Sequence, residues 1–243
     1  QFLSKNKDTD NWFLQIECFD PHEPFHAPKR FKELFPTNYD GPILDWPIYD
    51  RVKETREEIS ELKANYAALV TMVDEYFGKL LDYFDRYDLW KDTALILTTD
   101  HGFLLGEHDW WAKNRMPVYN EIAHIPLMIY HPDFKNKAGA RINSLTQTID
   151  IMPTFLDFFG LDIPSDVSGN SLLNVLEKDN EIRKALIFGY FGSACNITDG
   201  EYTYFRYPEK MSASDLYEYT LMPTRMTSRF SIKELSEMTL SNP

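Results

Sequence analysis

The stretch TALILTTDHG, residues 93–102, decides the fold class of this chain. Its first seven residues are mostly apolar and β-prone, which predicts a buried central strand. A carboxylate, an imidazole and a glycine that allows a sharp turn follow directly, as Asp100, His101 and Gly102. Ligands of open α/β sheets gather beyond the carboxyl ends of the strands. Residues 93–102 therefore predict an α/β domain with chemistry at Asp100 and His101.

A second strand is expected at residues 13–19, FLQIECF, where polar and apolar side chains alternate. The chain then enters DPHEPFHAP, residues 20–28, whose three prolines exclude both a helix and a continued strand. If the two strands are parallel neighbours, His22 reaches the sheet edge that holds Asp100 and His101. The carboxylate of Asp100 and the imidazole of His101, side by side on one turn, could then both point at a single cation.

The other expected elements complete an α/β pattern. Apolar side chains at steps of three and four predict a long helix over residues 51–87. A core strand is expected at residues 125–130, and a short helix at 150–160 has a proline in its first turn and a glycine at its end. Strands that alternate with helices favour a mixed or parallel sheet covered by helices.

The pattern changes past residue 185. Three short β-like pieces, 186–191, 195–198 and 201–207, include an Asp-Gly turn between the last two. We therefore expect two units, an α/β domain over residues 1–185 and a small antiparallel β appendage over residues 186–243.

Composition excludes several classes of partner. The chain has 243 residues and a net charge of −13, which argues against a nucleic-acid backbone or an anionic membrane surface. A small anionic substrate is still compatible, because local His, Lys and metal can override the global charge. No apolar run approaches the roughly 18 residues of a membrane helix. The oligomeric state cannot be predicted from these features.

The two cysteines, Cys18 and Cys195, are too few for a disulfide scaffold, and Cys18 is expected to be a small buried side chain within its strand. Few cysteines and the lack of a visible leader favour the cytoplasm, with a secreted or periplasmic location as the open alternative.

The block DHGFLLGEHDWWAK, residues 100–113, resembles the second signature of the sulfatase family, within the alkaline-phosphatase superfamily. The segment FDPHEPF, residues 19–25, looks like the family's other mid-chain landmark. Further matches follow in the same order: IPL at 125–127, DIMPT at 150–154 and GNSL at 169–172. The resemblance covers residues 12 to about 207 and implies an alkaline-phosphatase-like sheet sandwiched by helices.

The resemblance also implies roles for the matching residues. Asp100 and His101 would be ligands of a divalent cation, usually calcium in sulfatases. A hard cation prefers oxygen ligands, so the imidazole of His101 leaves manganese open. Lys113 would contact the sulfate oxygens and stabilise negative charge in the transition state. His22 would hydrogen-bond the ester oxygen and protonate the leaving group.

Glu107 and His108 are secondary candidates within the same block, with a purely architectural role in the loop as the alternative. Without the resemblance, Lys113 would be interpreted as an ordinary solvated lysine and His22 as a side chain that caps its loop.

The chain departs from the family at the nucleophile. Sulfatases convert the Cys of a Cys-x-Pro-x-Arg motif to formylglycine, and neither cysteine here has an Arg at the required offset. The family's early Asp-Asp pair of metal ligands is also missing. We therefore expect the chain to be a C-terminal portion without the formylglycine-bearing part, with no nucleophile of its own and no turnover in isolation.

Three functions follow from these observations. The first is a metal-dependent hydrolase of sulfuric esters that acts on a small anionic sulfate ester. The second is a phosphodiesterase or phosphonate monoester hydrolase of the same superfamily, which can share the Asp-His pair, the Lys and the His. The third is a non-catalytic binding module, which the missing nucleophile favours.

Overall fold

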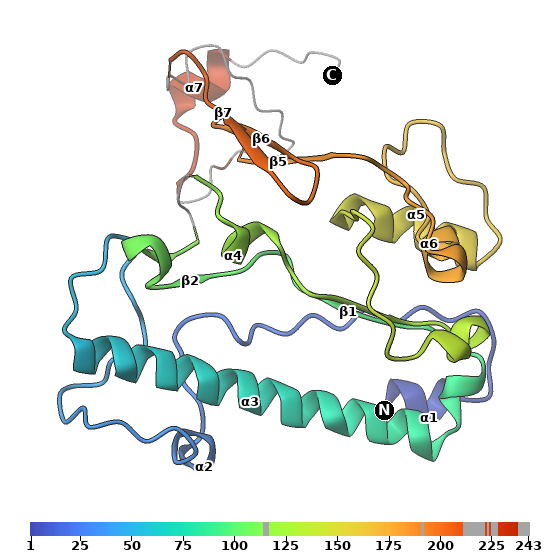
Figure 1. Cartoon of the computed structure of the whole chain (residues 1–243), viewed down its shortest axis with the longest axis horizontal. Helices are drawn as coiled ribbons and strands as arrows, with labels where there is room; N and C mark the ends of the chain where they lie inside the picture. Colours follow the sequence, from blue (N-terminus) through green and yellow to red (C-terminus); the bar gives the residue numbers. More distant parts are fainter. Residues whose placement is uncertain (114–116, 191, 211–221, 223, 225–227, 238–243) are drawn as a thin grey trace.

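The computed structural model describes residues 1–113, 117–190, 192–210, 222, 224 and 228–237 (Figure 1). A long helix, α3, spans Arg56–Arg86 and lies below the strands in the view of Figure 1. Thr55 caps it, because its Oγ1 accepts from Glu58 N at 3.3 Å and Glu58 Oε2 accepts from Thr55 N at 2.7 Å. The helix predicted over residues 51–87 is confirmed, with a start five residues later because Thr55 provides the cap.

Two short helices and a 3₁₀ turn surround α3. These are α1 (Phe2–Asn6), α2 (Lys29–Lys32) and η1 (Leu89–Lys91). The inner face of α3 buries Leu62, Ala68, Leu69 and Phe84. Leu69 belongs to a cluster with Phe25 and Phe31, and Phe84 to a cluster with Leu3 and Leu89. Helix α3 is therefore the surface on which the N-terminal loops are assembled.

Strand β1 (Leu95–Thr98) confirms that residues 93–99 contain a strand, but it is half-buried and, in the described residues, has one neighbour, so the expected buried central position is wrong. Its partner is β4 (Leu127–Tyr130), which lies antiparallel with Leu95 opposite Tyr130. In the described residues these two strands form a two-stranded sheet.

The prediction of a strand at residues 13–19 is wrong. This segment has no regular secondary structure, and Phe13, Ile16 and Phe19 are all more than half exposed. The segment does run beside β1, since Leu14 and Leu95 pack against the same buried cluster. Alternation of side chains becomes a strand only where the segment gains a hydrogen-bonded neighbour, and in the described residues β1 pairs with β4 alone. The expected parallel neighbours and the expected burial of Cys18 therefore both fail, and Cys18 is exposed.

A small hairpin follows β1. Strand β2 (Leu104–Leu105) pairs antiparallel with β3 (Trp111–Ala112), and the 3₁₀ turn η2 (Glu107–Asp109) joins them. Helix α4 (Asn120–Ala123) comes next, and the 3₁₀ turns η3 (Pro132–Lys137) and η4 (Thr148–Asp150) follow β4.

Helix α5 (Ile151–Phe158) confirms the short helix predicted at residues 150–160. The chain leaves it at Gly160, whose φ of +66° favours glycine. Asp150 is fully buried at its start and accepts two hydrogen bonds from Arg183. This pair fixes α5 against the chain that leads from α6 (Leu173–Lys178) to the last sheet.

That last sheet is antiparallel, in the order β5 (Leu186–Gly189), β6 (Cys195–Thr198) and β7 (Thr203–Arg206). The three β-like pieces predicted past residue 185 are therefore confirmed within the described residues, although residue 191 and most of 211–243 lie outside them. The short helix α7 (Ile232–Glu237) follows. No helix of the described chain is long and apolar enough to span a bilayer.

Candidate active site

The β2–β3 hairpin places Lys113 beside the Asp-His-Gly turn. Leu104 lies opposite Ala112, so the next residue, Lys113, continues alongside Phe103. Phe103 follows His101 by two residues. The register of the hairpin thus joins two parts of the chain that the sequence separates by a dozen positions.

The loop that carries His22 reaches the same place through Phe25. This ring is fully buried and meets Phe103 edge-to-face, with ring centroids 5.5 Å apart. Phe25 N donates to Asp45 O at 2.6 Å, which fixes the backbone of the loop. Burial of the Phe25 ring therefore positions His22 at the site. The sequence had predicted that a parallel strand would position it.

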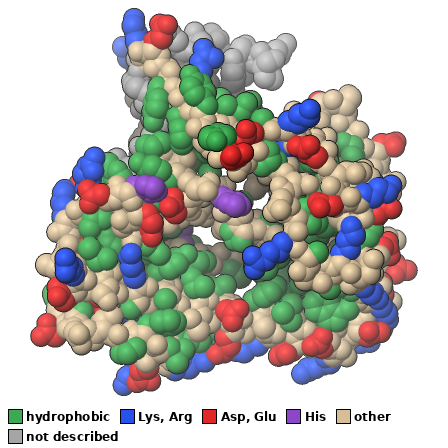
Figure 2. Space-filling view, in the orientation of Figure 1, with side chains coloured by type: hydrophobic (Ala, Val, Ile, Leu, Met, Phe, Trp, Pro, Cys, Tyr) green, Lys and Arg blue, Asp and Glu red, His purple; other side chains and the backbone are tan. Residues whose placement is uncertain are grey.

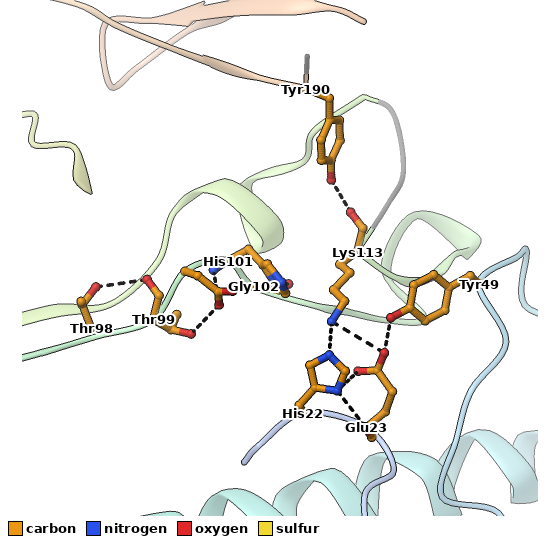
Figure 3. Close-up of polar contacts among 10 residues, drawn as sticks. His22, Glu23, Tyr49, Thr98, Thr99, His101, Gly102, Lys113 and Tyr190 are labelled. Atoms are coloured by element: carbon orange, nitrogen blue, oxygen red, sulfur yellow. Dashed lines mark hydrogen bonds and ion pairs between the residues drawn. The ribbon is translucent and has the colours of Figure 1, made fainter. Parts of the chain in front are cut away.

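His22 and Lys113 meet directly (Figure 3). Lys113 Nζ lies 2.5 Å from His22 Nε2, across 91 positions of sequence. The Lys113 side chain is 12% exposed and that of His22 36%, so both are sheltered but open to solvent. Tyr190, just beyond β5, donates its hydroxyl to the backbone carbonyl of Lys113. The last sheet is thus attached to this site.

Glu23 lies beneath this pair and is only 2% exposed. Its Oε2 lies 3.3 Å from His22 Nδ1, and its Oε1 lies 3.7 Å from Lys113 Nζ. The hydroxyl of Tyr49 donates to Oε1. Burial and this hydrogen bond raise the pKa of Tyr49 above its ordinary value, so the phenol stays neutral and donates.

Asp100 and His101 form a second pair, held by their own turn. Asp100 Oδ1 accepts from His101 N at 2.9 Å and from the Thr99 hydroxyl at 3.3 Å. Partial burial opposes ionisation, yet His101 and these donors outweigh it and hold the pKa of Asp100 below its usual value. Gly102 is needed for close packing, because a Cβ there would lie 1.8 Å from Glu121 O. Its φ is not positive, so the expected sharp turn is not the reason for the glycine.

The chemistry of this pair fits two ligands of one cation. His101 Nδ1 lies 2.9 Å from the carbonyl of Gly102 and therefore donates to it, which leaves the lone pair on Nε2. That nitrogen lies 3.5 Å from Asp100 Oδ2. This separation is compatible with neighbouring positions in one coordination sphere. Within the described residues, no three His, Cys, Asp or Glu side chains gather into a fuller set.

Glu107 and His108 have local partners. Glu107 Oε2 accepts from Leu105 N at 2.5 Å, which closes the hairpin. His108 stacks on Tyr119 with ring centroids 3.7 Å apart, and its Nε2 lies 3.1 Å from Glu121 Oε2. These contacts fit the architectural alternative for both residues.

The four primary candidates thus fall into two pairs, His22 with Lys113 and Asp100 with His101, on neighbouring segments of the chain. Figure 2 shows histidine side chains beside a hollow near the middle of this face of the molecule. Sequence reasoning missed Glu23, Tyr49 and Tyr190. Only Glu23 carried a signal, as an acidic residue between His22 and a proline.

Two family models match the chain. The family model described as Sulfatase matches residues 1–161. A second model, described as N-sulphoglucosamine sulphohydrolase, C-terminal, matches residues 106–241. Together these matches include both pairs of candidate residues.

Three similar proteins illustrate the likeness. An N-acetylglucosamine-6-O-sulfatase of Bacteroides thetaiotaomicron is 40% identical over 131 residues, 52% of this chain and 23% of its own length. A structure in complex with its substrate D-glucosamine-2-N,6-O-disulfate is 31% identical with a TM-score of 0.56, over 66% of this chain and 33% of that one. A phosphonate monoester hydrolase from Silicibacter pomeroyi is 30% identical with a TM-score of 0.57, over 64% and 34%.

The chain therefore has the alkaline-phosphatase-like α/β fold of these structures, as the resemblance predicted. It spans between about a quarter and a third of the length of the three proteins.

Proposed function

Because the chain belongs to the sulfatase family, we propose that it carries part of the active site of a metal-dependent sulfuric-ester hydrolase. His22 and Lys113 are the proposed catalytic residues, and Asp100 and His101 the proposed cation ligands. The observation that most supports this is the 2.5 Å contact between Lys113 Nζ and His22 Nε2. An ammonium and an imidazole from distant segments suit an anionic ester better than they suit a structural contact.

Each side chain has one task in this proposal. The Lys113 ammonium contacts sulfate oxygens, where negative charge grows as the ester bond breaks. His22 protonates the oxygen of the departing alcohol. Asp100 and His101 hold a divalent cation, with calcium favoured by the carboxylate and manganese by the imidazole. When bound, that cation supplies a Lewis acid for the sulfate oxygens.

The nucleophile is proposed to come from outside these 243 residues, as the formylglycine of a longer protein. Neither cysteine here lies in the Cys-x-Pro-x-Arg motif. We therefore expect no turnover by the chain alone. We also propose residues 1–185 as part of the catalytic domain and residues 186–243 as a separate β-rich unit.

A sulfated amino sugar is the first substrate to assay. One relative is an N-acetylglucosamine-6-O-sulfatase, and one similar structure holds D-glucosamine-2-N,6-O-disulfate. The alternative substrate is a phosphonate monoester, favoured by the 30% identical hydrolase of that activity. Parallel assays with both esters on the longer protein distinguish the two.

Asp100→Ala tests the assignment. In the longer protein it should abolish both hydrolysis and cation binding, measured by turnover and by calcium and manganese calorimetry. The exposed Asp162→Ala is a matched control that should change neither. Retained hydrolysis in Asp100→Ala would refute the proposed ligand role, and a wild type inactive on every ester would favour a binding module.

A further inference from the structure

Glu23 is the one acid in contact with both His22 and Lys113 among the described residues, and the proposed function gives it no task. It is 2% exposed, and its Oε2 has no hydrogen-bond partner. A buried carboxylate oxygen without a hydrogen bond is costly. The Tyr49 hydroxyl, the Lys113 ammonium and His22 Nδ1 beside the carboxylate offset part of this cost, which indicates that the site requires a negative charge here.

The contacts of His22 define where its protons lie. Nδ1 lies 2.7 Å from the backbone carbonyl of Glu23 and 3.3 Å from Oε2 of the same residue. Both neighbours are acceptors, so Nδ1 carries a proton. Nε2 faces Lys113 Nζ at 2.5 Å, and it accepts from the ammonium when no substrate is present.

Acid catalysis requires His22 to carry one more proton than it does in this contact with Lys113. To act as an acid, His22 must carry a second proton on Nε2 while Lys113 remains an ammonium. Two positive charges then lie side by side in a sheltered site, where their repulsion is poorly screened. A buried anion that touches both lowers the energy of that state.

We propose that Glu23 is a positioning residue that acts as the shared counter-ion of His22 and Lys113 and keeps His22 able to donate a proton. The proposal rests on the proposed function. As the oxygen nucleophile bonds to sulfur, the ester S–O bond breaks and its electron pair stays on the leaving oxygen. The proton on His22 Nε2 moves to that oxygen, and the imidazole becomes neutral.

Tyr49 supports this role. Its hydroxyl donates to Glu23 Oε1, which turns Oε2 toward His22 Nδ1. The titratable groups that face the Glu23 carboxylate from the described elements around it are therefore Tyr49, His22 and Lys113. Tyr49→Phe removes only the hydroxyl, and we expect a smaller effect of the same kind.

The activity test compares leaving groups in the longer protein. With Glu23→Gln, kcat for a sugar sulfate, whose alcohol needs a proton, should fall by about 10²-fold. With 4-nitrophenyl sulfate, whose phenolate leaves without one, it should fall by less than about tenfold, and KM should change little for both. The alkaline limb of the kcat/KM–pH profile should move to lower pH. Glu33→Gln, an exposed residue after α2, is the matched control.

A second measurement needs no activity. In this chain labelled with ¹⁵N-histidine, the pH at which His22 takes up its second proton should be lower in Glu23→Gln than in wild type. If Glu23→Gln does not fold, Tyr49→Phe replaces it in both the activity test and the His22 titration. Equal losses for the two leaving groups, with an unmoved pH profile and an unmoved His22 titration, would overturn the proposal. If the longer wild-type protein hydrolyses none of the esters but the His22 titration still responds to Glu23→Gln, the proposed function is refuted and the role of Glu23 is retained.

Discussion

Asp150 and Glu23 are both buried acids, but their surroundings differ. Asp150 is fully buried, and each of its oxygens accepts from an Arg183 nitrogen and a backbone N–H, those of Asn170 and Gln147. Glu23 receives one hydroxyl on Oε1 and leaves Oε2 without a hydrogen bond. A saturated carboxylate fixes structure, whereas an unsaturated one beside sheltered cations can respond to a change in charge.

The two acids also differ in how closely the chain packs around them and in how far solvent reaches their neighbours. Around Asp150, the hydroxyl of Thr154 accepts from Leu172 N at 2.9 Å, and Gly169 packs so closely that a Cβ would lie 2.0 Å from Ile149 O. Around Glu23, the neighbouring His22 and Lys113 keep part of their side chains in solvent. The first region has no room for a ligand, while the second has cationic groups that a small anion can reach.

Arg183→Met gives the largest expected effect. It leaves the Asp150 charge buried without its cation, and we expect the free energy of unfolding to fall by about 3–5 kcal/mol. Urea unfolding followed by circular dichroism measures this. The adjacent Lys184→Met, at an exposed position, is the control and should change stability by less than about 0.5 kcal/mol. A loss below about 1 kcal/mol for Arg183→Met would remove the distinction between the two acids.

Lys113→Met tests the other region. We expect kcat/KM of the longer protein to fall by about 10²–10³-fold, because a group that stabilises transition-state charge is lost. Stability should fall by less than in Arg183→Met, since Tyr49 and His22 still contact Glu23. Lys29→Met, at an exposed lysine, controls for loss of charge. A large loss of stability with little loss of rate would make Glu23 a structural acid like Asp150.

The pH dependence of stability tests the structural role of Asp150, in contrast to that of Glu23. Burial opposes ionisation of Asp150, but Arg183 and the two backbone donors outweigh it and lower its pKa. A lowered folded pKa adds stability above the unfolded value of about 3.9, and that stability is lost as pH falls through the folded value. Asp150→Asn should therefore be less stable than wild type by about 1–3 kcal/mol near neutral pH, with a smaller gap below about pH 4. Urea titrations at both pH values check this, and a constant gap would contradict it.

Tyr190→Phe should have the smallest effect. Its hydroxyl donates to the backbone carbonyl of Lys113. Loss of one positioning hydrogen bond should reduce kcat/KM by less than about tenfold, which corresponds to roughly 1 kcal/mol. Tyr204→Phe, at an exposed tyrosine of β7, should leave the rate unchanged. A loss as large as that of Lys113→Met would show that the last sheet, and not Glu23, positions the lysine.

Local chemistry explains which features could be predicted from the sequence. Helix α3 follows from its apolar period and from Thr55, and the three strands past residue 185 follow from short β-prone runs around turns. The turn at Asp100 and His101 is also local, because each side chain is held by atoms one residue away. Residues 13–19 show the limit of such reasoning, since alternation does not say whether the segment will form hydrogen bonds with another strand.

The family, helix α3, helix α5, the three strands past residue 185 and the residue types at Asp100, His101, Lys113 and His22 all follow from the sequence alone. Only the tertiary structure decided that Glu23 and Tyr49 lie under the last two, and that β4 rather than residues 13–19 pairs with β1. The reason is physical. A turn or a helix face is fixed by contacts within a few residues, whereas the burial of a carboxylate depends on side chains that folding brings from distant positions.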